Sequence, residues 1–210
     1  MSRVWTREPG LLPPQLPVPS VDLVRLPDGS FLLTGPETVA RRGMLPMPLS
    51  GFHLRPGACR ALFGIAADEV PVDGVPVSSP RSAELEPDAV VARAIAAIRA
   101  TPGVAITELA GLVGLSERQL RRRFAVEVGL RPKEYARVVR LHRAVASRGR
   151  WADIAVRCGC YDQAHLLAEF RKAGCSPADV RFLQAAGKAS GSGSTHDLRM
   201  ARADGARRTA

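Results

Sequence analysis

Residues 110–177 contain an internal repeat, and this repeat constrains the fold more than any other feature of the chain. The matching pairs are Ala110 and Ala155, Gly114 and Gly159, Leu120 and Leu166, Phe124 and Phe170, Gly129 and Gly174, and Pro132 and Pro177. The offset is 45 residues, widens to 46 at the Leu and Phe pairs, and returns to 45. Glycine turn positions and helically spaced apolar residues that occur twice predict two copies of one helix–turn–helix unit, a more specific signal than a single copy.

Apolar residues recur at helical spacing from residue 87 onward. The helices expected from this spacing cover residues 87–101, 106–113, 116–128, 133–147, 152–158 and 162–172. Ser116 and Asp162 are expected N-caps, and Gly114 is expected to end the helix before it. We therefore predict a helical domain over residues 84–184.

The first part of the chain has a different pattern. Residues 1–20 are Pro-rich and are predicted to be extended. Residues 21–79 carry the strand-like stretches VDLVRL, SFLLTG and GFHLRP and a short helix, ACRALFGI, and are predicted to form a small α+β domain. Residues 185–210 lack apolar periodicity and are predicted to be a disordered basic tail. The expected fold class is thus mainly α, with a small α+β domain ahead of the helices.

The basic residues are concentrated in the helical region. Residues 81–183 hold eighteen Lys and Arg against eleven Asp and Glu, whereas residues 1–80 hold seven of each. A local excess of this kind favours a polyanionic partner. No apolar run approaches the length of a membrane span and no signal segment is evident, so we expect a cytoplasmic protein. The four cysteines are then expected to be reduced.

The stretch SERQLRRRF, residues 116–124, carries the first candidate binding surface. With Leu120 and Phe124 directed to the core, Arg118 and Arg122 point outward and Gln119 and Arg121 flank them. Such a face can be a solvated basic surface. After a glycine turn and the N-cap Ser116, however, it suits the DNA major groove, where Arg pairs with guanine and Gln with adenine.

The second copy offers a different outward face. With Leu166 and Phe170 inward, Ala164 and Ala168 point outward, where they can contact thymine methyl groups. Gln163 is the candidate for base contact in the first turn, and Arg171 and Lys172 are candidate phosphate ligands. We interpret this copy mainly as a positioning module.

The stretches LAGLVGLSERQLRRRF, GLRPKEYARVVRLHRA and DIAVRCGCYDQAHLLAEFRKAGCSPADVR resemble the AraC/XylS family of bacterial transcription regulators over about residues 87–183. The resemblance implies seven helices, with two helix–turn–helix modules joined by a long helix at about 133–148. It implies duplex DNA as the partner, bound in successive major grooves, and no enzymatic activity or cofactor. RNA polymerase and a small-molecule effector are further candidate partners. Cys160 stands where members usually have Phe or Tyr, and Ala168 where many have Arg. Residues 21–65 also resemble the small domain that precedes this unit in one subgroup, in a shortened form.

Two alternatives use the cysteines. Cys158, Cys160, His165 and Cys175 contain the donor atoms of a zinc site, although the Cys-x-Cys spacing is not the usual two-residue knuckle. Cys59 is a candidate reactive thiol, without an evident base or metal partner nearby. A zinc- or thiol-dependent DNA-associated protein is therefore the alternative to a regulator without a metal. A regulator that works through protein contacts alone is disfavoured by Arg118, Arg121 and Arg122.

Overall fold

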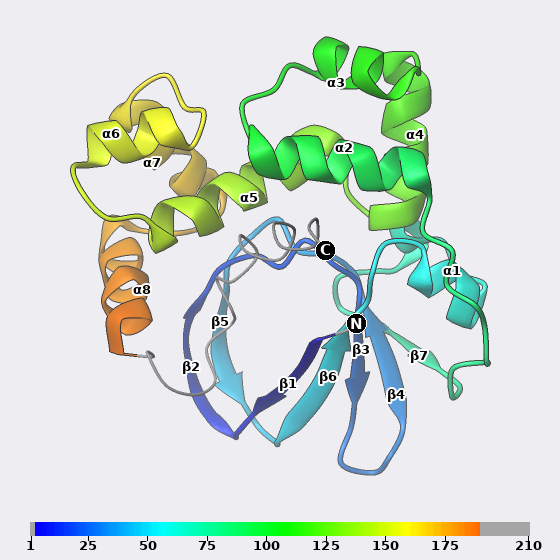
Figure 1. Cartoon of the computed structure of the whole chain (residues 1–210). Helices are drawn as coiled ribbons and strands as arrows, with labels where there is room; N and C mark the ends of the chain where they lie inside the picture. Colours follow the sequence, from blue (N-terminus) through cyan, green and yellow to red (C-terminus); the bar gives the residue numbers. More distant parts are fainter. Residues whose placement is uncertain (1–2, 190–210) are drawn as a thin grey trace, which may run out of the picture.

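The structure, a computed structural model, describes residues 3–189, in which a strand-rich part is followed by a helical part (Figure 1). The strands are β1 (Arg3–Arg7), β2 (Gly10–Gln15), β3 (Asp22–Arg25), β4 (Phe31–Thr34), β5 (Arg41–Leu45), β6 (Leu49–His53) and β7 (Val75–Val77). The helix α1 (Ala58–Phe63) and the 3-10 helix η1 (Ala67–Glu69) lie between β6 and β7. The remaining helices are α2 (Ala89–Ala100), α3 (Ile106–Val113), α4 (Glu117–Val128), α5 (Pro132–Ala146), α6 (Trp151–Arg157), α7 (Gln163–Lys172) and α8 (Pro177–Ala189).

Antiparallel pairing joins strands that are distant in the sequence. One sheet has the strand order β1-β6-β3-β4-β7, and β2 pairs with β5 in a second sheet. The predicted turn between β3 and β4 is closed by the Leu26 amide, which donates to the Ser30 carbonyl at 2.9 Å, and Gly29 supplies the positive φ of 85° that this turn requires. The Pro-rich residues before Asp22 contribute β1 and β2, which the sheets incorporate through β6 and β5.

The helical part has two cores that share α5. In residues 89–189 the structure has seven helices, which confirms the predicted fold class. The first core packs α2, α3 and α4 against the start of α5 around Phe124, and the second packs α6, α7 and α8 against its end around Phe170. Tyr135 of α5 contacts Phe124 edge-on, at 5.5 Å between ring centroids, and Trp151 contacts Phe170 in the same way at 6.2 Å. We call α2–α4 the first module and α6–α8 the second.

The strand-rich part contacts the C-terminal ends of both α4 and α7 (Figure 1). The Gly57 amide donates to the Glu127 carbonyl at 3.1 Å, and the Ala40 amide donates to the Ala173 carbonyl at 2.8 Å. Arg42 forms an ion pair with Asp179 and donates to the Gly174 carbonyl at 2.8 Å. These contacts occupy the C-terminal ends of the α4 and α7 backbones, and the N-terminal ends of the two helices lie away from the sheets (Figure 1).

The end of the helical part differs from the prediction. Residues 185–189 were predicted to belong to a disordered tail, but α8 continues through them to Ala189. The sequence AAGKA there has no large apolar residue, and the helix is continued from the buried Val180 near its start rather than by a periodic pattern of its own. Residues 190–210 of the predicted tail lie outside the described residues. Within the described range, no helix has the length and hydrophobicity of a membrane span.

Candidate nucleic-acid interface

The sequence before α4 builds a sharp turn and a capped helix start. Gly114 ends α3 with a φ of 71°, a conformation that glycine adopts without steric cost. Ser116 is the N-cap, as predicted: the Gln119 amide donates to its Oγ at 3.3 Å, and the Ser116 amide donates to Oε1 of Gln119 at 3.0 Å. This reciprocal pair satisfies two amides at the helix start and fixes the direction in which α4 leaves the turn.

The outward face of α4 carries the predicted residues in exposed positions. Leu120 and Phe124 are fully buried, and Arg118, Gln119, Arg121 and Arg122 are exposed. Arg121 forms an ion pair with Glu117, and Thr107 of α3 donates to that carboxylate at 2.9 Å. These two contacts lower the pKa of Glu117, the bond from Thr107 contributing most.

Arg118 and Arg122 differ from their neighbours in having no acidic partner. Among residues 3–189, no ion pair involves either guanidinium, whereas Arg121 and Arg123 are both paired. Arg123 leans back to α2 and bonds to Asp88, the residue that caps α2 by accepting from the Val90 amide at 2.9 Å. Two unpaired cations one helical turn apart therefore remain on the outward face.

The outward face of α7 is smaller and less charged. Asp162 is the N-cap, as predicted, and accepts a hydrogen bond from the His165 amide at 2.7 Å. Gln163 and Ala164 are exposed, while Ala168 is half-buried. Arg171 is exposed, but the Lys172 ammonium group donates to Oε1 of Glu169 at 3.2 Å. Of the two predicted phosphate ligands, only Lys172 has a carboxylate beside it.

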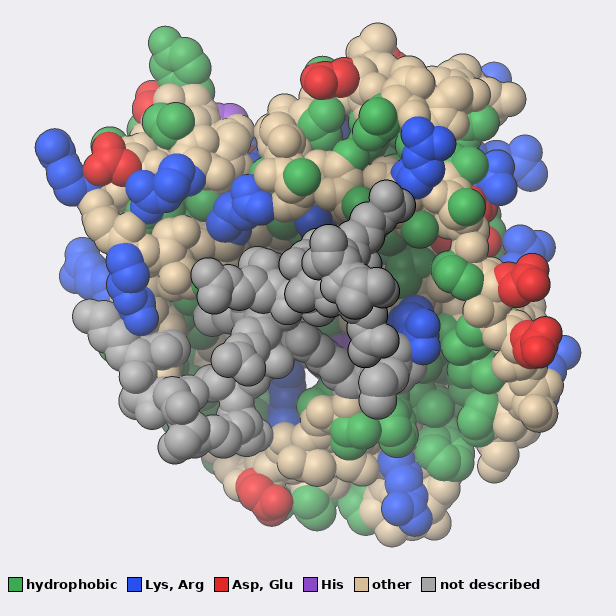
Figure 2. Space-filling model, viewed as in Figure 1, with side chains coloured by type: hydrophobic (Ala, Val, Ile, Leu, Met, Phe, Trp, Pro, Cys, Tyr) green, Lys and Arg blue, Asp and Glu red, His purple; other side chains and the backbone are tan. Residues whose placement is uncertain are grey.

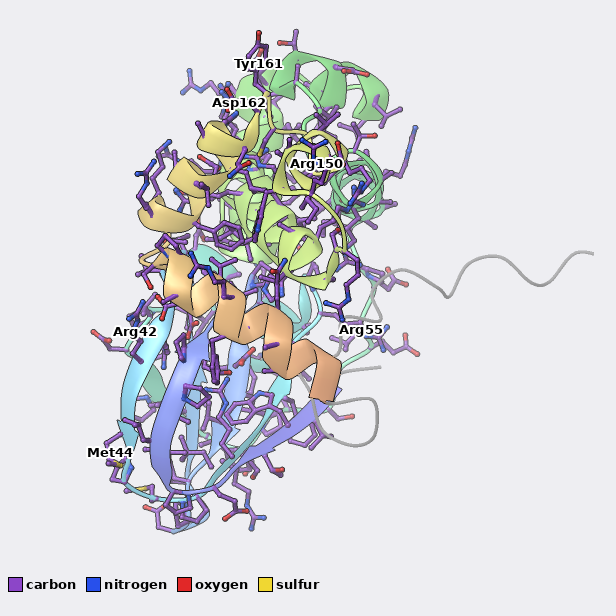
Figure 3. The ribbon with its side chains drawn as sticks, turned by 90° about the vertical axis from the view of Figure 1, so that its left-hand side faces the viewer. Arg42, Met44, Arg55, Arg150, Tyr161 and Asp162 are labelled. Carbon is purple, nitrogen blue, oxygen red and sulfur yellow. The ribbon has the colours of Figure 1, made fainter. Side chains whose placement is uncertain are left out.

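Two exposed residues near the start of the second module were missed by the sequence analysis. Tyr161, immediately before the N-cap of α7, is 90% exposed. Arg150, the N-cap residue of α6, is also exposed, and both lie in the helical part well away from the sheets (Figure 3). Their position at the start of a helix was the available signal, because side chains there project beyond the helix end.

The N-terminal ends of α4 and α7 lie on the side of the helical part opposite the sheets (Figures 1 and 3). Lys and Arg side chains are spread over the surface of α5–α8 and over the region of α4 (Figure 2). The two helix starts, with Arg118, Arg122, Tyr161 and Gln163 near them, thus form one candidate interface with a predominantly positive rim.

The cysteine cluster does not form a site with His165. Cys158, Cys160 and Cys175 are buried in the core of the second module, while His165 is exposed on α7, where its Nδ1 accepts from the Tyr161 amide at 3.3 Å. Within residues 3–189, no group of three or more His, Cys, Asp or Glu side chains is placed to hold a metal ion. Burial, with a smaller contribution from Glu69, raises the pKa of Cys59 to about 11, opposite to the change that activates a thiol.

Residues 109–182 match a family model described as a helix-turn-helix domain. No curated protein matches the chain. Among solved structures, a transcriptional regulator of Chromobacterium violaceum with an AraC-type DNA-binding domain is 24% identical, with 46% of this chain and 92% of that one covered and a TM-score of 0.41. The DNA-binding domain of AdpA, a global transcriptional factor solved with a target DNA, is 27% identical over 49% of this chain and 95% of that one, with a TM-score of 0.40. ToxT of Vibrio cholerae is 9% identical over 87% of this chain and 98% of that one, with a TM-score of 0.48.

The matched segment begins in α3 and ends in α8, so it contains both copies of the repeat and the helix that joins them. Its two glycine turns, at Gly114 and Gly159, each precede a capped helix with an exposed outward face. Residues 109–182 are therefore an AraC-type helix–turn–helix domain, the kind found in DNA-binding transcription regulators.

Proposed function

We propose that this DNA-binding regulator recognises specific sites mainly through α4, which enters the major groove with Arg118 and Arg122 against base edges. Members of the family are generally not enzymes, and DNA is their partner. RNA polymerase and a small-molecule effector stay predictions drawn from the family resemblance.

The exposed pair of Arg118 and Arg122 is the observation that supports this function most strongly. Two like charges four residues apart destabilise an isolated helix by a few tenths of a kcal/mol, and no acidic residue among the described ones offsets them. A bound polyanion removes this cost. A guanidinium group can also donate two hydrogen bonds to guanine, and such a pair is worth about 1–3 kcal/mol of discrimination against other bases.

The other residues of this face have lesser roles. Gln119 uses its side-chain oxygen in the capping box with Ser116, so pairing with adenine requires it to leave the cap. Arg121 likewise shares its charge with Glu117. We therefore assign Ser116 and Gln119 mainly to the orientation of α4, and the Arg121 guanidinium group to a phosphate near the helix start.

The second module contributes position more than sequence preference. Ala164 and Ala168 allow α7 to approach the groove closely, and Gln163 is its residue for base contact. Tyr161 extends the same surface with a ring that can pack on a sugar or a thymine methyl group. Arg171 and Lys172 contact phosphates, which carry no sequence information.

The experiment is a selection of preferred sites from random duplex DNA with the full chain, with R118A and R122A, and with R25A as the matched control. Arg25 is exposed on β3, so its removal changes the net charge equally without touching α4. We expect one half of the selected motif to be strongly defined and the other weakly, about one helical turn away. R118A and R122A should relax the strong half, and R25A should not.

Affinity for the selected site should also fall steeply with salt, because several phosphates are neutralised. An affinity that is flat from low to physiological salt, or a motif unchanged by R118A and R122A, would contradict the proposal.

A further inference from the structure

The two modules touch each other directly at their connecting segments. Gly103, between α2 and α3, lies against Gly159, in the turn between α6 and α7. A Cβ atom added to Gly103 would lie 3.1 Å from the Cα of Gly159, and one added to Gly159 would lie 2.6 Å from the Gly103 amide nitrogen. Real Cβ atoms essentially never come as close as the one added at Gly159 would, and the distance at Gly103 is tighter than nine in ten real Cβ contacts. The two backbones are therefore in contact without an intervening side chain.

Arg140 of α5 connects the same two places. Its Nη1 donates to the Pro102 carbonyl at 2.8 Å, beside Gly103, and its Nη2 donates to Oε2 of Glu169 at 3.0 Å. Glu169 belongs to α7, the second candidate recognition helix. Arg140 thus joins α7 to the segment between α2 and α3.

The environment makes this connection rigid. The side chains of Arg140 and Glu169 are only 16% and 7% exposed, so water competes little for their hydrogen bonds. Burial opposes ionisation of Glu169, but the hydrogen bonds from Arg140 and Lys172 outweigh it and lower the pKa of its carboxyl group. Removing Glu169 alone would leave the largely buried Arg140 guanidinium without its carboxylate, and removing Arg140 alone would leave Glu169 with Lys172 as its remaining cation.

We propose that Arg140 is a positioning residue that fixes the distance and angle between α4 and α7, and so determines which spacing of two DNA half-sites the protein accepts. This inference rests on the proposed function, since it requires both helices to contact DNA. A shift of one base pair moves a half-site by roughly 3.4 Å along the axis and by about a tenth of a turn around it. A rigid pair of modules cannot follow that shift, whereas a pair linked only through α5 and the strand-rich part can.

The test measures affinity for duplexes that carry the selected site with its halves moved apart or together by one and two base pairs. The full chain should bind the best spacing at least about tenfold more tightly than its neighbours, the loss expected when most of one module's contact is forfeited. The variant R140M/E169M removes both buried charges and keeps the volume apolar, which is tolerated far better than removal of one partner. It should bind all spacings within about threefold of one another, with unchanged affinity for a duplex that carries only the half-site of α4.

R143M is the matched control. Arg143 lies one turn further along α5 and bonds to the Arg99 carbonyl and, at 3.3 Å, to the Ala100 carbonyl, both in the first module. R143M should keep the spacing preference of the full chain. R140K should keep part of that preference, because the lysine ammonium group can still donate one of the two hydrogen bonds that Arg140 makes. Thermal unfolding of each variant identifies any that fails to fold; if R140M/E169M does, R140Q/E169Q, which also removes both buried charges, takes its place.

Three outcomes separate the two proposals. A full chain without any preferred site would overturn the proposed function. A spacing preference that persists in R140M/E169M, or in R140Q/E169Q where that takes its place, would overturn the role of Arg140 and leave the proposed function standing. Loss of the preference in R143M as well would show that α5 as a whole, and not Arg140, fixes the geometry.

Discussion

The cores beneath α4 and α7 are almost interchangeable, whereas their outward faces are not. Leu120 and Phe124 in α4, and Leu166 and Phe170 in α7, are each at most 1% exposed. The outward positions of α4 hold Arg118 and Arg122, and those of α7 hold Ala164 and Ala168. Residues at the repeated positions thus determine how each module folds, and the residues between them determine what each module can contact.

The residues that α4 and α7 contribute to their ion pairs have opposite charges, and the two pairs differ in burial. Arg123 of α4 and Glu169 of α7 occupy equivalent positions, 46 residues apart. Arg123 is 49% exposed and reaches Asp88 of its own module, while the 7% exposed Glu169 reaches Arg140 of the shared helix. The first helix is therefore held within its module, and the second is held to the rest of the domain.

The largest effects should fall on the shared feature, the core. F124A and F170A should each lower the free energy of unfolding by about 3–5 kcal/mol, because each ring is fully enclosed and leaves a cavity. Urea denaturation of the two variants measures this. Losses that differ by more than about 2 kcal/mol would contradict the equivalence of the two cores. The cost of a Phe→Ala substitution depends on how far the surrounding core collapses into the cavity, so similar cores should give similar losses.

The outward faces should give the next largest effects, and unequal ones. R118A or R122A should weaken binding to the selected site by about 1–3 kcal/mol, because each removes a candidate guanine contact. Q163A should cost less, since a single residue carries base recognition in α7. Fluorescence titration of labelled duplex DNA, specific and random, gives both values. A larger loss for Q163A would show that α7 is the main recognition helix.

The helical part was predictable because its signals are local. The repeat, the glycine turns and the caps at Ser116 and Asp162 placed α3, α4 and α7 within about one residue of their observed bounds, closer than such boundaries usually fall. Strands β1, β2, β5 and β7 were not predicted, since residues such as Pro13, Pro14 and Gly43 interrupt any alternation. Their pairing depends on partners some 30 to 50 residues away.

The candidate site was predictable only as a set of outward positions. Helical periodicity shows that Arg118 and Arg121 face away from the core, but not that Arg121 is paired with Glu117 while Arg118 is unpaired. It also misses Arg140, whose partners Pro102 and Glu169 lie 38 and 29 residues away in the sequence. Contacts of this kind are set by the packing of modules, which a pattern within one helix does not record.

Acid should destabilise the two modules to different extents. The pKa values of Asp88 and Glu169 are both lowered, because hydrogen bonds to the carboxylates outweigh the opposing effect of burial. A carboxyl group with a lowered folded-state pKa stabilises the fold above its ordinary pKa of about 4, and this contribution disappears as the pH falls below that value.

E169Q should therefore flatten the dependence of unfolding free energy on pH between about 5 and 3 more than D88N does. The ion pair between Glu169 and Arg140 is buried. The ion pair between Asp88 and Arg123 is screened more strongly by solvent, because Arg123 is exposed. Asn still caps α2, so D88N removes the charge and keeps the cap. Urea denaturation across this pH range is the measurement, and equal flattening by both substitutions would mean that burial does not distinguish the two pairs.

The smallest effects should separate Arg171 from Lys172, the two candidate phosphate ligands at the end of α7. R171A should weaken specific and random DNA alike and reduce the slope of log affinity against log salt by about one, as expected for one phosphate contact. K172A should reduce the slope less, because the Lys172 ammonium group already lies 3.2 Å from a Glu169 oxygen and must give up part of that contact to bind phosphate. Comparing the double variant K172A/E169Q with E169Q tests this explanation. Without the competing carboxylate charge, removal of Lys172 should reduce the slope by about one. If Lys172 is a full phosphate ligand despite Glu169, K172A will lower the slope as much as R171A, and the assignment of α7 to positioning will rest on both residues equally.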